Sequence, residues 1–245
     1  MKEVLYTIPL NDAVNADTEC PFCYIEKDVE QDLLDYVLGS CASYMEADTR
    51  ELTDTEGFCR DHFKKMYAYG NTLGNGWILK THFMRINSQY KDQVKKFKPI
   101  KVSLKDKLSG KDEPNNSMTK WVKEKESSCY ICKRFNETFD RYIKTFFYLY
   151  NNDTEFKEKI SKSKGFCLSH FGVLIQEADG EISTKDKDEF YNMMFRLMDE
   201  NMKRMQEDVS WLVEKFDYKN KDADWKNSKD AVQRGMQKLK GGIYG

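Results

Sequence analysis

The chain has 245 residues, of which 40% are hydrophobic and 33% are charged. This composition supports a buried core and excludes an intrinsically disordered protein. The net charge of −1 gives no overall attraction to nucleic acid or to an anionic membrane. The N-terminus lacks the features of a signal peptide, and no stretch approaches the ~18 apolar residues of a membrane span. We therefore expect a cytoplasmic protein with neither a membrane nor a nucleic-acid partner.

The first half of the chain, residues 1–98, shows helical patterns after an N-terminal stretch that we expect to be extended up to Cys20. Apolar residues between Ile25 and Val37 recur every three or four positions, and Gly39 would end that helix. The predicted elements of this half are a helix over 25–37, a loop with one short helical turn over 41–56, and helices over 59–70 and 73–97.

The stretch 99–117 contains Pro99, Pro114 and scattered lysines without periodicity, which is typical of a linker. The second half, residues 118–216, repeats the order of the first. Helices are predicted there over 129–149, 157–162, 167–177 and 184–216, and a tail over 217–245 would pack on the bundle through a short helix over 228–239.

Apolar residues of the long helix 184–216, many of them methionines, recur at steps of three and four. This stripe must be buried by other helices of the chain or by a partner, so we expect a protein partner or self-association through it. No alternating strand pattern of useful length occurs. The sequence therefore predicts an all-α fold of two tandem related helical halves, a long C-terminal helix and a tail.

A pattern of cysteines and a histidine occurs twice. Each copy has a CxxC pair, then 34 or 35 residues, then a CxxH pair that follows Gly-Phe. Three thiolates and one imidazole are a complete tetrahedral ligand set for Zn2+. We therefore predict two zinc ions per chain, one within each half. The predicted ligands are Cys20, Cys23, Cys59 and His62 in the first half, and Cys129, Cys132, Cys167 and His170 in the second.

Each ligand pair would lie at a helix N-terminus, where free N–H groups and the helix dipole favour thiolates. Four protein ligands leave no open position, which is typical of a structural site. Two other uses of the same cysteines stay open. They could hold an iron–sulfur cluster, or act in thiol redox chemistry, although a βαβ context is missing and only Cys20-Pro-Phe-Cys23 has a proline between its cysteines.

Some further residues are candidates outside this pattern. His82 is the only histidine not in it, and with Tyr218, Trp225 and Asn227 of the tail it forms a candidate ligand or partner site. Cys41 has no equivalent in the second copy, and we expect a small buried residue there. No phosphate-binding, zinc-protease or nucleophile-elbow motif occurs. We thus expect a zinc-binding adaptor module; the alternatives are an iron–sulfur or thiol redox protein, and an enzyme with a pocket around His82 and the tail.

Several motifs also carry a family resemblance. They are Ile8-Pro9, Cys20-Pro-Phe-Cys23, Tyr44-Met45-Glu46, Gly57-Phe58-Cys59 through His62, Thr81-His82, Gly165-Phe166-Cys167 through His170, and Phe216-Asp217-Tyr218 through Asp230. Through them the whole chain resembles an uncharacterised family from anaerobic Firmicutes, whose members are sometimes labelled substrate-binding proteins of ABC transporters. The resemblance implies cytoplasmic placement and the paired metal sites, and it implies no activity.

Overall fold

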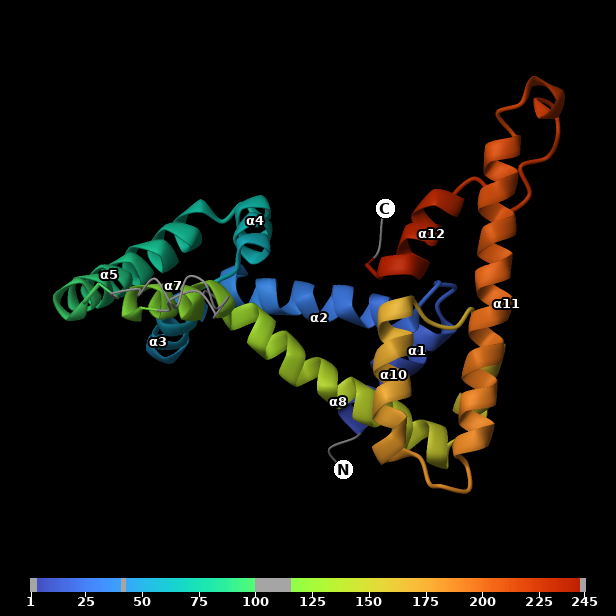
Figure 1. The fold of residues 1–245 in the computed structure, drawn as a ribbon, viewed down its shortest axis with the longest axis horizontal. Helices are drawn as coiled ribbons and strands as arrows, with labels where there is room; N and C mark the ends of the chain where they lie inside the picture. Colours follow the sequence, from blue (N-terminus) through green and yellow to red (C-terminus); the bar gives the residue numbers. More distant parts are fainter. Residues whose placement is uncertain (1–3, 41–42, 100–115, 243–245) are drawn as a thin grey trace, which may run out of the picture. The chain divides into compact units, whose positions relative to one another are not determined.

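The computed structural model describes residues 4–40, 43–99 and 116–242, which form eleven α-helices and no strand (Figure 1). The all-α prediction is confirmed over these residues. Cys41 and nearly all of the predicted linker lie outside the described residues. The helices are α1 (Val4–Asn15), α2 (Pro21–Leu38), α3 (Ala47–Glu56), α4 (Arg60–Tyr69), α5 (Thr72–Lys96), α7 (Ser117–Ser127), α8 (Tyr130–Asn152), α9 (Thr154–Lys162), α10 (Leu168–Glu181), α11 (Lys187–Glu214) and α12 (Ala231–Lys240).

The chain forms two compact units. We call residues 1–29 and 138–245 unit 1, and residues 30–137 unit 2. Both boundaries fall inside helices, because α2 begins in unit 1 and ends in unit 2, whereas α8 begins in unit 2 and ends in unit 1. Each unit therefore combines residues from both halves of the sequence. None of the described helices is both long enough and apolar enough to cross a membrane.

The expectation of an extended N-terminus is wrong, because residues 4–15 form α1. Pro9 lies inside this helix and removes one backbone donor, which is why the sequence argued against a helix there. Packing outweighs that loss. Leu10 and Ala13 are fully buried, α1 packs against α9, and the ring of Tyr6 meets that of Tyr142 edge-on at 4.8 Å.

The core of unit 1 is aromatic, and Phe22 lies at its centre. This residue stands between the two cysteines of the first CxxC pair and is completely buried. Its ring centroid lies 5.5 Å from that of Phe139, 5.7 Å from Phe146 and 5.8 Å from Phe166. Full burial of such a side chain is worth about 1.5–3 kcal/mol. The packing of Phe22 therefore fixes the position of the cysteines on either side of it, Cys20 and Cys23.

The core of unit 2 is built around the second part of α2. Leu34, Val37 and Leu38 are buried there together with Phe58 and Ile131. The predicted loop over 41–56 is more helical than expected, because most of it forms α3. Two buried threonines, Thr49 and Thr53, place this helix against α5. Their polar side chains explain why the hydrophobic pattern did not reveal the helix.

The long methionine-rich helix of the sequence is α11, and α12 lies alongside it within unit 1 (Figure 1). Met194, Met198 and Met205 are buried among the chain's own helices. Much of the predicted stripe is therefore covered within the chain, by α9, α10 and α12.

Candidate metal centres

All four cysteine-containing pairs lie at helix N-termini, as predicted. Cys20 and Cys129 come directly before α2 and α8, while Cys59 and Cys167 are the N-cap residues of α4 and α10. Backbone N–H groups there face sulfur: the N–H of His170 lies 3.5 Å from Cys167 Sγ. Such donors and the helix dipole stabilise thiolates.

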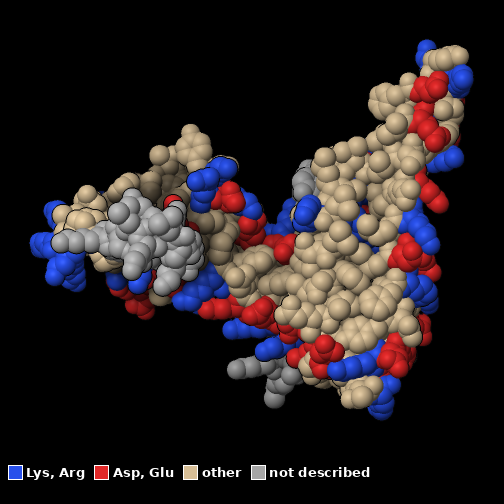
Figure 2. Space-filling model, in the orientation of Figure 1, with Lys and Arg blue, Asp and Glu red and all other residues tan. Residues whose placement is uncertain are grey.

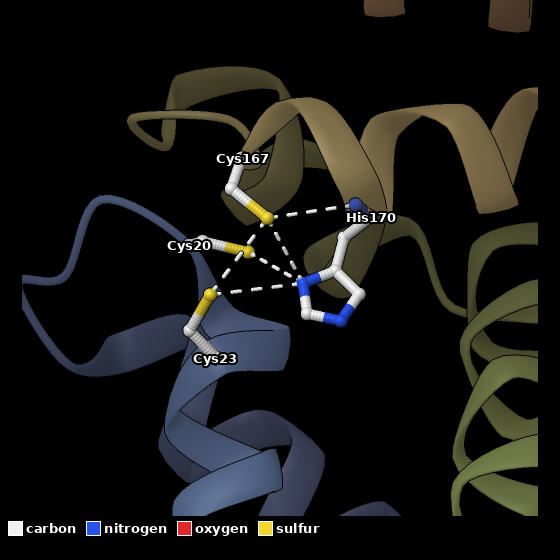
Figure 3. Close-up of side chains that lie close together, drawn as sticks. All are labelled: Cys20, Cys23, Cys167 and His170. Carbon is white, nitrogen blue, oxygen red and sulfur yellow. Dashed lines mark hydrogen bonds between the residues drawn. The ribbon is translucent and has the colours of Figure 1, made fainter. Parts of the chain in front are cut away.

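The first group of ligand atoms, cluster A, lies in unit 1 and consists of Cys20, Cys23, Cys167 and His170 (Figure 3). The Nδ1 atom of His170 lies 3.3 Å from Cys20 Sγ, 3.7 Å from Cys23 Sγ and 3.2 Å from Cys167 Sγ. The sulfurs of Cys23 and Cys167 are 3.8 Å apart. One imidazole nitrogen and three sulfurs thus face a common centre.

The second group, cluster B, lies in unit 2 and consists of Cys59, His62, Cys129 and Cys132. The Nδ1 atom of His62 lies 3.2 Å from the sulfurs of both Cys59 and Cys129, and 3.3 Å from Cys132 Sγ. The sulfurs of Cys59 and Cys132 are 3.8 Å apart. The two clusters have the same ligand types in nearly the same arrangement.

The structure corrects the predicted pairing. Each cluster joins the CxxC pair of one half to the CxxH pair of the other, so neither half contains a complete cluster. The reason lies in the length of α2. Phe58, next to Cys59, packs in the same core as Leu34, which is eleven residues beyond Cys23, or about 16 Å along the helix. Cys59 is therefore held away from Cys23, and the CxxC pair of α8 completes its cluster instead.

Both clusters fit the geometry of a single tetrahedral ion. Zinc–sulfur bonds of about 2.3 Å and zinc–nitrogen bonds of about 2.0–2.1 Å imply sulfur–sulfur distances of about 3.8 Å and sulfur–nitrogen distances of about 3.6 Å. One sulfur–sulfur distance is 3.8 Å in each cluster, and the sulfur–nitrogen distances run from 3.2 to 3.7 Å. All ligand atoms of a cluster lie within 4.8 Å of one another.

A carboxylate orients each histidine from the far side of its ring. His170 Nε2 lies 3.1 Å from Glu26 Oε1, and His62 Nε2 lies 3.2 Å from Glu30 Oε1. A carboxylate at Nε2 holds the proton there and leaves Nδ1 free to bind a cation, an arrangement typical of histidine ligands in metal sites. Both glutamates stand on α2, one turn apart, so this helix supports both clusters.

The ionisation of cluster B favours thiolate charge. Burial opposes ionisation of Cys129, but hydrogen bonds from His62 and from the Cys132 backbone outweigh it and lower the pKa of Cys129 to about 6. Burial likewise lowers the pKa of His62, but its bonds to Cys129 and Glu30 outweigh this effect and raise that pKa to about 10. A cation at the centre would take the place of the proton at Nδ1.

Cluster A shows the same separation of charge. Hydrogen bonds from Cys20 and Cys23 lower the pKa of Cys167, and the hydrogen bond that Cys23 donates to Cys167 raises its own pKa. Burial works against protonation of His170, yet Cys167, Cys20 and Glu26 raise its pKa to about 12. Negative charge is thus stabilised on one sulfur of each cluster, while burial and the neighbouring thiols raise the pKa of Cys132 in cluster B.

The two clusters differ in their cover. All four residues of cluster A are buried, whereas Cys59 and Cys132 of cluster B are half-buried. The chain folds back over cluster A after α12: a Cβ at Gly241 would lie 3.5 Å from the sulfurs of both Cys23 and Cys167. The segment at Gly241 therefore covers cluster A.

A buried cation lies beside cluster A. Lys238 is 1% exposed and donates hydrogen bonds to backbone carbonyls, including that of Glu19 at 2.8 Å. Three thiolates around Zn2+ carry a net charge of about −1, which a nearby ammonium would partly neutralise. The Glu19 carboxylate balances Lys238; burial works against its ionisation, but Arg204 and Lys238 keep the pKa of Glu19 below its ordinary value of 4.5.

The remaining candidate residues have separate surroundings. His82 in unit 2 is half-buried and donates from Nδ1 to the backbone carbonyl of Asp54 at 3.0 Å. In unit 1, Tyr218 is 82% exposed, the Trp225 ring packs under the ammonium of Lys215, and Asn227 is exposed. A ligand site shared by His82 and the tail stays a prediction.

Sequence reasoning did not find the groups that support the ligands. Glu26 and Glu30 follow the first CxxC pair by three and seven positions and share a helix face with it, a spacing that could have pointed to them. Lys238 and Gly241 have no such local signal, because they lie more than 60 residues from any ligand.

The fold and the clusters define the class of this protein: over the described residues it is all-helical, with two groups of three cysteines and one histidine that could each hold a metal ion. The chain belongs to DUF6062, a family of unknown function whose model matches residues 1–245. No curated protein and no solved structure matches it. The family match bears on neither the source organism nor a role in transport.

Proposed function

We propose that the protein is a zinc-binding helical adaptor module in which clusters A and B each hold one structural zinc ion. The observation that carries this proposal is the agreement of both clusters with a tetrahedron around one ion. Four protein ligands fill that coordination sphere, so the ions would stabilise the fold and take no part in a reaction. Zinc–thiolate sites require reduced cysteines, which supports placement in the cytoplasm.

An iron–sulfur cluster is the first alternative. Its four ligands are divided among two or more iron atoms with sulfides between them, so ligands on different irons lie farther apart than the edges of a tetrahedron around one ion. The short distances within both clusters favour a single ion. Among the six described cysteines, Cys59 and Cys132 of cluster B are the half-buried ones, so thiol redox chemistry would have access there. In an enzyme with a pocket at His82, Nε2 would be the available ring nitrogen, because Nδ1 donates to a backbone carbonyl.

Metal analysis of protein purified without oxygen tests the proposal. We expect two zinc ions per chain and a colourless solution. Iron together with sulfide and visible absorption would replace the proposal with electron transfer. Protein without any bound metal, but with unchanged helical content and thermal stability, would refute a structural metal in both clusters.

We further propose that the adaptor binds its partner through the groove between α11 and α12. This groove has a volume of about 510 Å3 and includes Met202, Val209 and Leu239 in its lining. The face of unit 1 around α10, α11 and α12 is largely free of Lys, Arg, Asp and Glu in Figure 2. A shallow apolar groove between two helices suits the apolar face of a third helix, which a second copy of the chain could provide.

Light scattering during size-exclusion chromatography tests self-association through this groove. We expect the mass to rise with protein concentration and this rise to be lost in Leu239→Lys. A matched control is Tyr67→Lys, a substitution at a residue that is 86% exposed in unit 2. Self-association that persists in Leu239→Lys would rule out the groove as the contact.

A further inference from the structure

A basic pocket lies in unit 1, separate from both clusters. It has a volume of about 640 Å3, and its lining comes from α11, from α12, and from the segments before α2, α10 and α12. This volume lies within the range of small-molecule sites, but the lining is charged where such sites are usually apolar. Five of the lining side chains are basic and two are acidic; the basic ones are Lys164, Arg204, Lys226, Lys229 and Arg234.

The floor of the pocket is a fixed ionic network. Glu19 is 1% exposed and forms ion pairs with Arg204 and Arg234. Asp208 lies 2.9 Å from Arg234 Nη1 and 3.6 Å from Arg204 Nη1. Both guanidinium groups are therefore held in place and line the pocket, and Arg234 also pairs with Asp230 through Nε at 2.9 Å and donates from Nη2 to the Asn227 carbonyl.

Positive charge exceeds negative charge in this region. The five basic side chains of the lining are the cations. Asp17 and Asp230 of the lining, with Glu19 and Asp208 of the floor, make four carboxylates. The difference is one positive charge, in a chain whose overall net charge is −1. A local surplus of this sign attracts anions.

The loop before α12 contributes Lys226 and Lys229 to the lining of this pocket. Lys226 has a φ of 51°, the only positive value of a non-glycine residue in the part of the chain that is described. Its N–H donates to the side chain of Asp224 at 2.6 Å, and the buried Ser228 donates to the Trp225 carbonyl at 2.6 Å. A non-glycine residue in this region of φ is unfavourable and marks a position that surrounding contacts must hold. The contacts fix Lys226 and Lys229 beside the two arginines.

We propose that this pocket binds the phosphate group of a small phosphorylated molecule. A phosphate monoester carries a charge of about −2 at neutral pH, which is opposite in sign to the local surplus. Arginine side chains in fixed orientations suit its oxygens, and lysines add point charges at the rim. The pocket is larger than one phosphate needs, so a carbon-containing part of the ligand fits beside it. This site is independent of the metal proposal, because none of its lining residues belongs to cluster A or B.

Titration calorimetry on the full chain tests the proposal, with inorganic phosphate, pyrophosphate and glycerol 3-phosphate as probes. The test variant is Lys226→Met with Lys229→Met, which removes two charges from the pocket. The matched control is Lys219→Met with Lys221→Met, which removes two charges from exposed positions of the same tail outside the pocket lining. All four lysines are exposed, so both variants should fold, and circular dichroism would check this.

We expect saturable binding of at least one probe, with a Kd raised at least tenfold in the test variant and by less than twofold in the control. Equal weakening in both variants would show a general charge effect and overturn the site. Absence of saturable binding for all three probes would also overturn it. Vesicles with and without phosphatidic acid separate the two sources of phosphate: stronger binding to vesicles than to glycerol 3-phosphate would overturn a soluble ligand.

Discussion

The crossed pairing of the clusters makes a prediction that metal counting can decide. In the double variant Cys20→Ser with Cys167→Ser, both changes fall in cluster A, so we expect one zinc ion per chain to remain. In Cys20→Ser with Cys59→Ser, both changes fall in the first half of the sequence but in different clusters. We expect this variant to retain no zinc.

The effect on stability follows from the size of the metal contribution. Zinc binding to a structural site of this kind is worth about 10–16 kcal/mol in peptides at neutral pH. A whole domain is stable by only about 5–15 kcal/mol, so loss of one ion is sufficient to loosen the unit that holds it. The first variant should lose hydrogen-exchange protection in α10 and keep it in α4. The second should lose protection in both helices.

Elemental analysis of the purified variants, combined with hydrogen exchange, makes the measurement. Cys41→Ser is the control and should keep two zinc ions, since each cluster has four ligands without Cys41. The reasoning would be refuted by the opposite counts, namely one zinc ion in Cys20→Ser with Cys59→Ser and none in Cys20→Ser with Cys167→Ser. Those counts would mean that each half holds its own ion.

Three further predictions test the surroundings of the clusters. Glu26→Gln should weaken zinc affinity at cluster A about 10–100-fold, and Glu30→Gln should do the same at cluster B. A chelator competition in which wild type and variant have equal zinc affinities would exclude the orienting role of these glutamates. Because the pKa of Glu19 is lower in the folded chain, its ionisation contributes stability above pH 4.5, and this contribution is lost as the pH falls below that value. The difference in unfolding free energy between wild type and Glu19→Gln, measured in urea, should therefore shrink below pH 4.5. Gly57 has a φ of 62°, and a Cβ there would lie 2.9 Å from Cε1 of His82, so Gly57→Ala should lower the stability by about 1–3 kcal/mol. Gly76→Ala, at an open helical position, should raise it by about 0.5–1 kcal/mol. A thermal-melting comparison in which both variants gain stability would contradict this.

The sequence predicted the ligand types and their helix positions because both depend on local spacing. A CxxC pair before a helical pattern places thiolates near free N–H groups whatever the tertiary fold is. The spacing of Cys59 and His62 likewise puts both on the first turn of α4. Apolar periodicity located most helices for the same reason, and it failed for α1, α3 and α7. A proline lies inside α1, the buried residues of α3 are threonines, and α7 has no buried residue.

The pairing of the motifs could not be predicted, because it depends on tertiary packing. Cys23 is 36 residues from Cys59 and 144 residues from Cys167. Loop closure over the longer distance costs only about 1.2 kcal/mol more, at about 0.6 kcal/mol for each doubling. Burial of one aromatic side chain such as Phe22 exceeds that difference. Proximity in the sequence was therefore a weak guide to which cysteines meet.

The course of α2 and α8 has a consequence for how such a chain could be divided. If the backbone were cut between residues 98 and 116, each fragment would carry one CxxC and one CxxH pair, yet both clusters would need both fragments. The fragments would then be obligate partners, and their reassembly would depend on metal. A fragment with one copy of the motifs could complete neither cluster in this arrangement without a second chain.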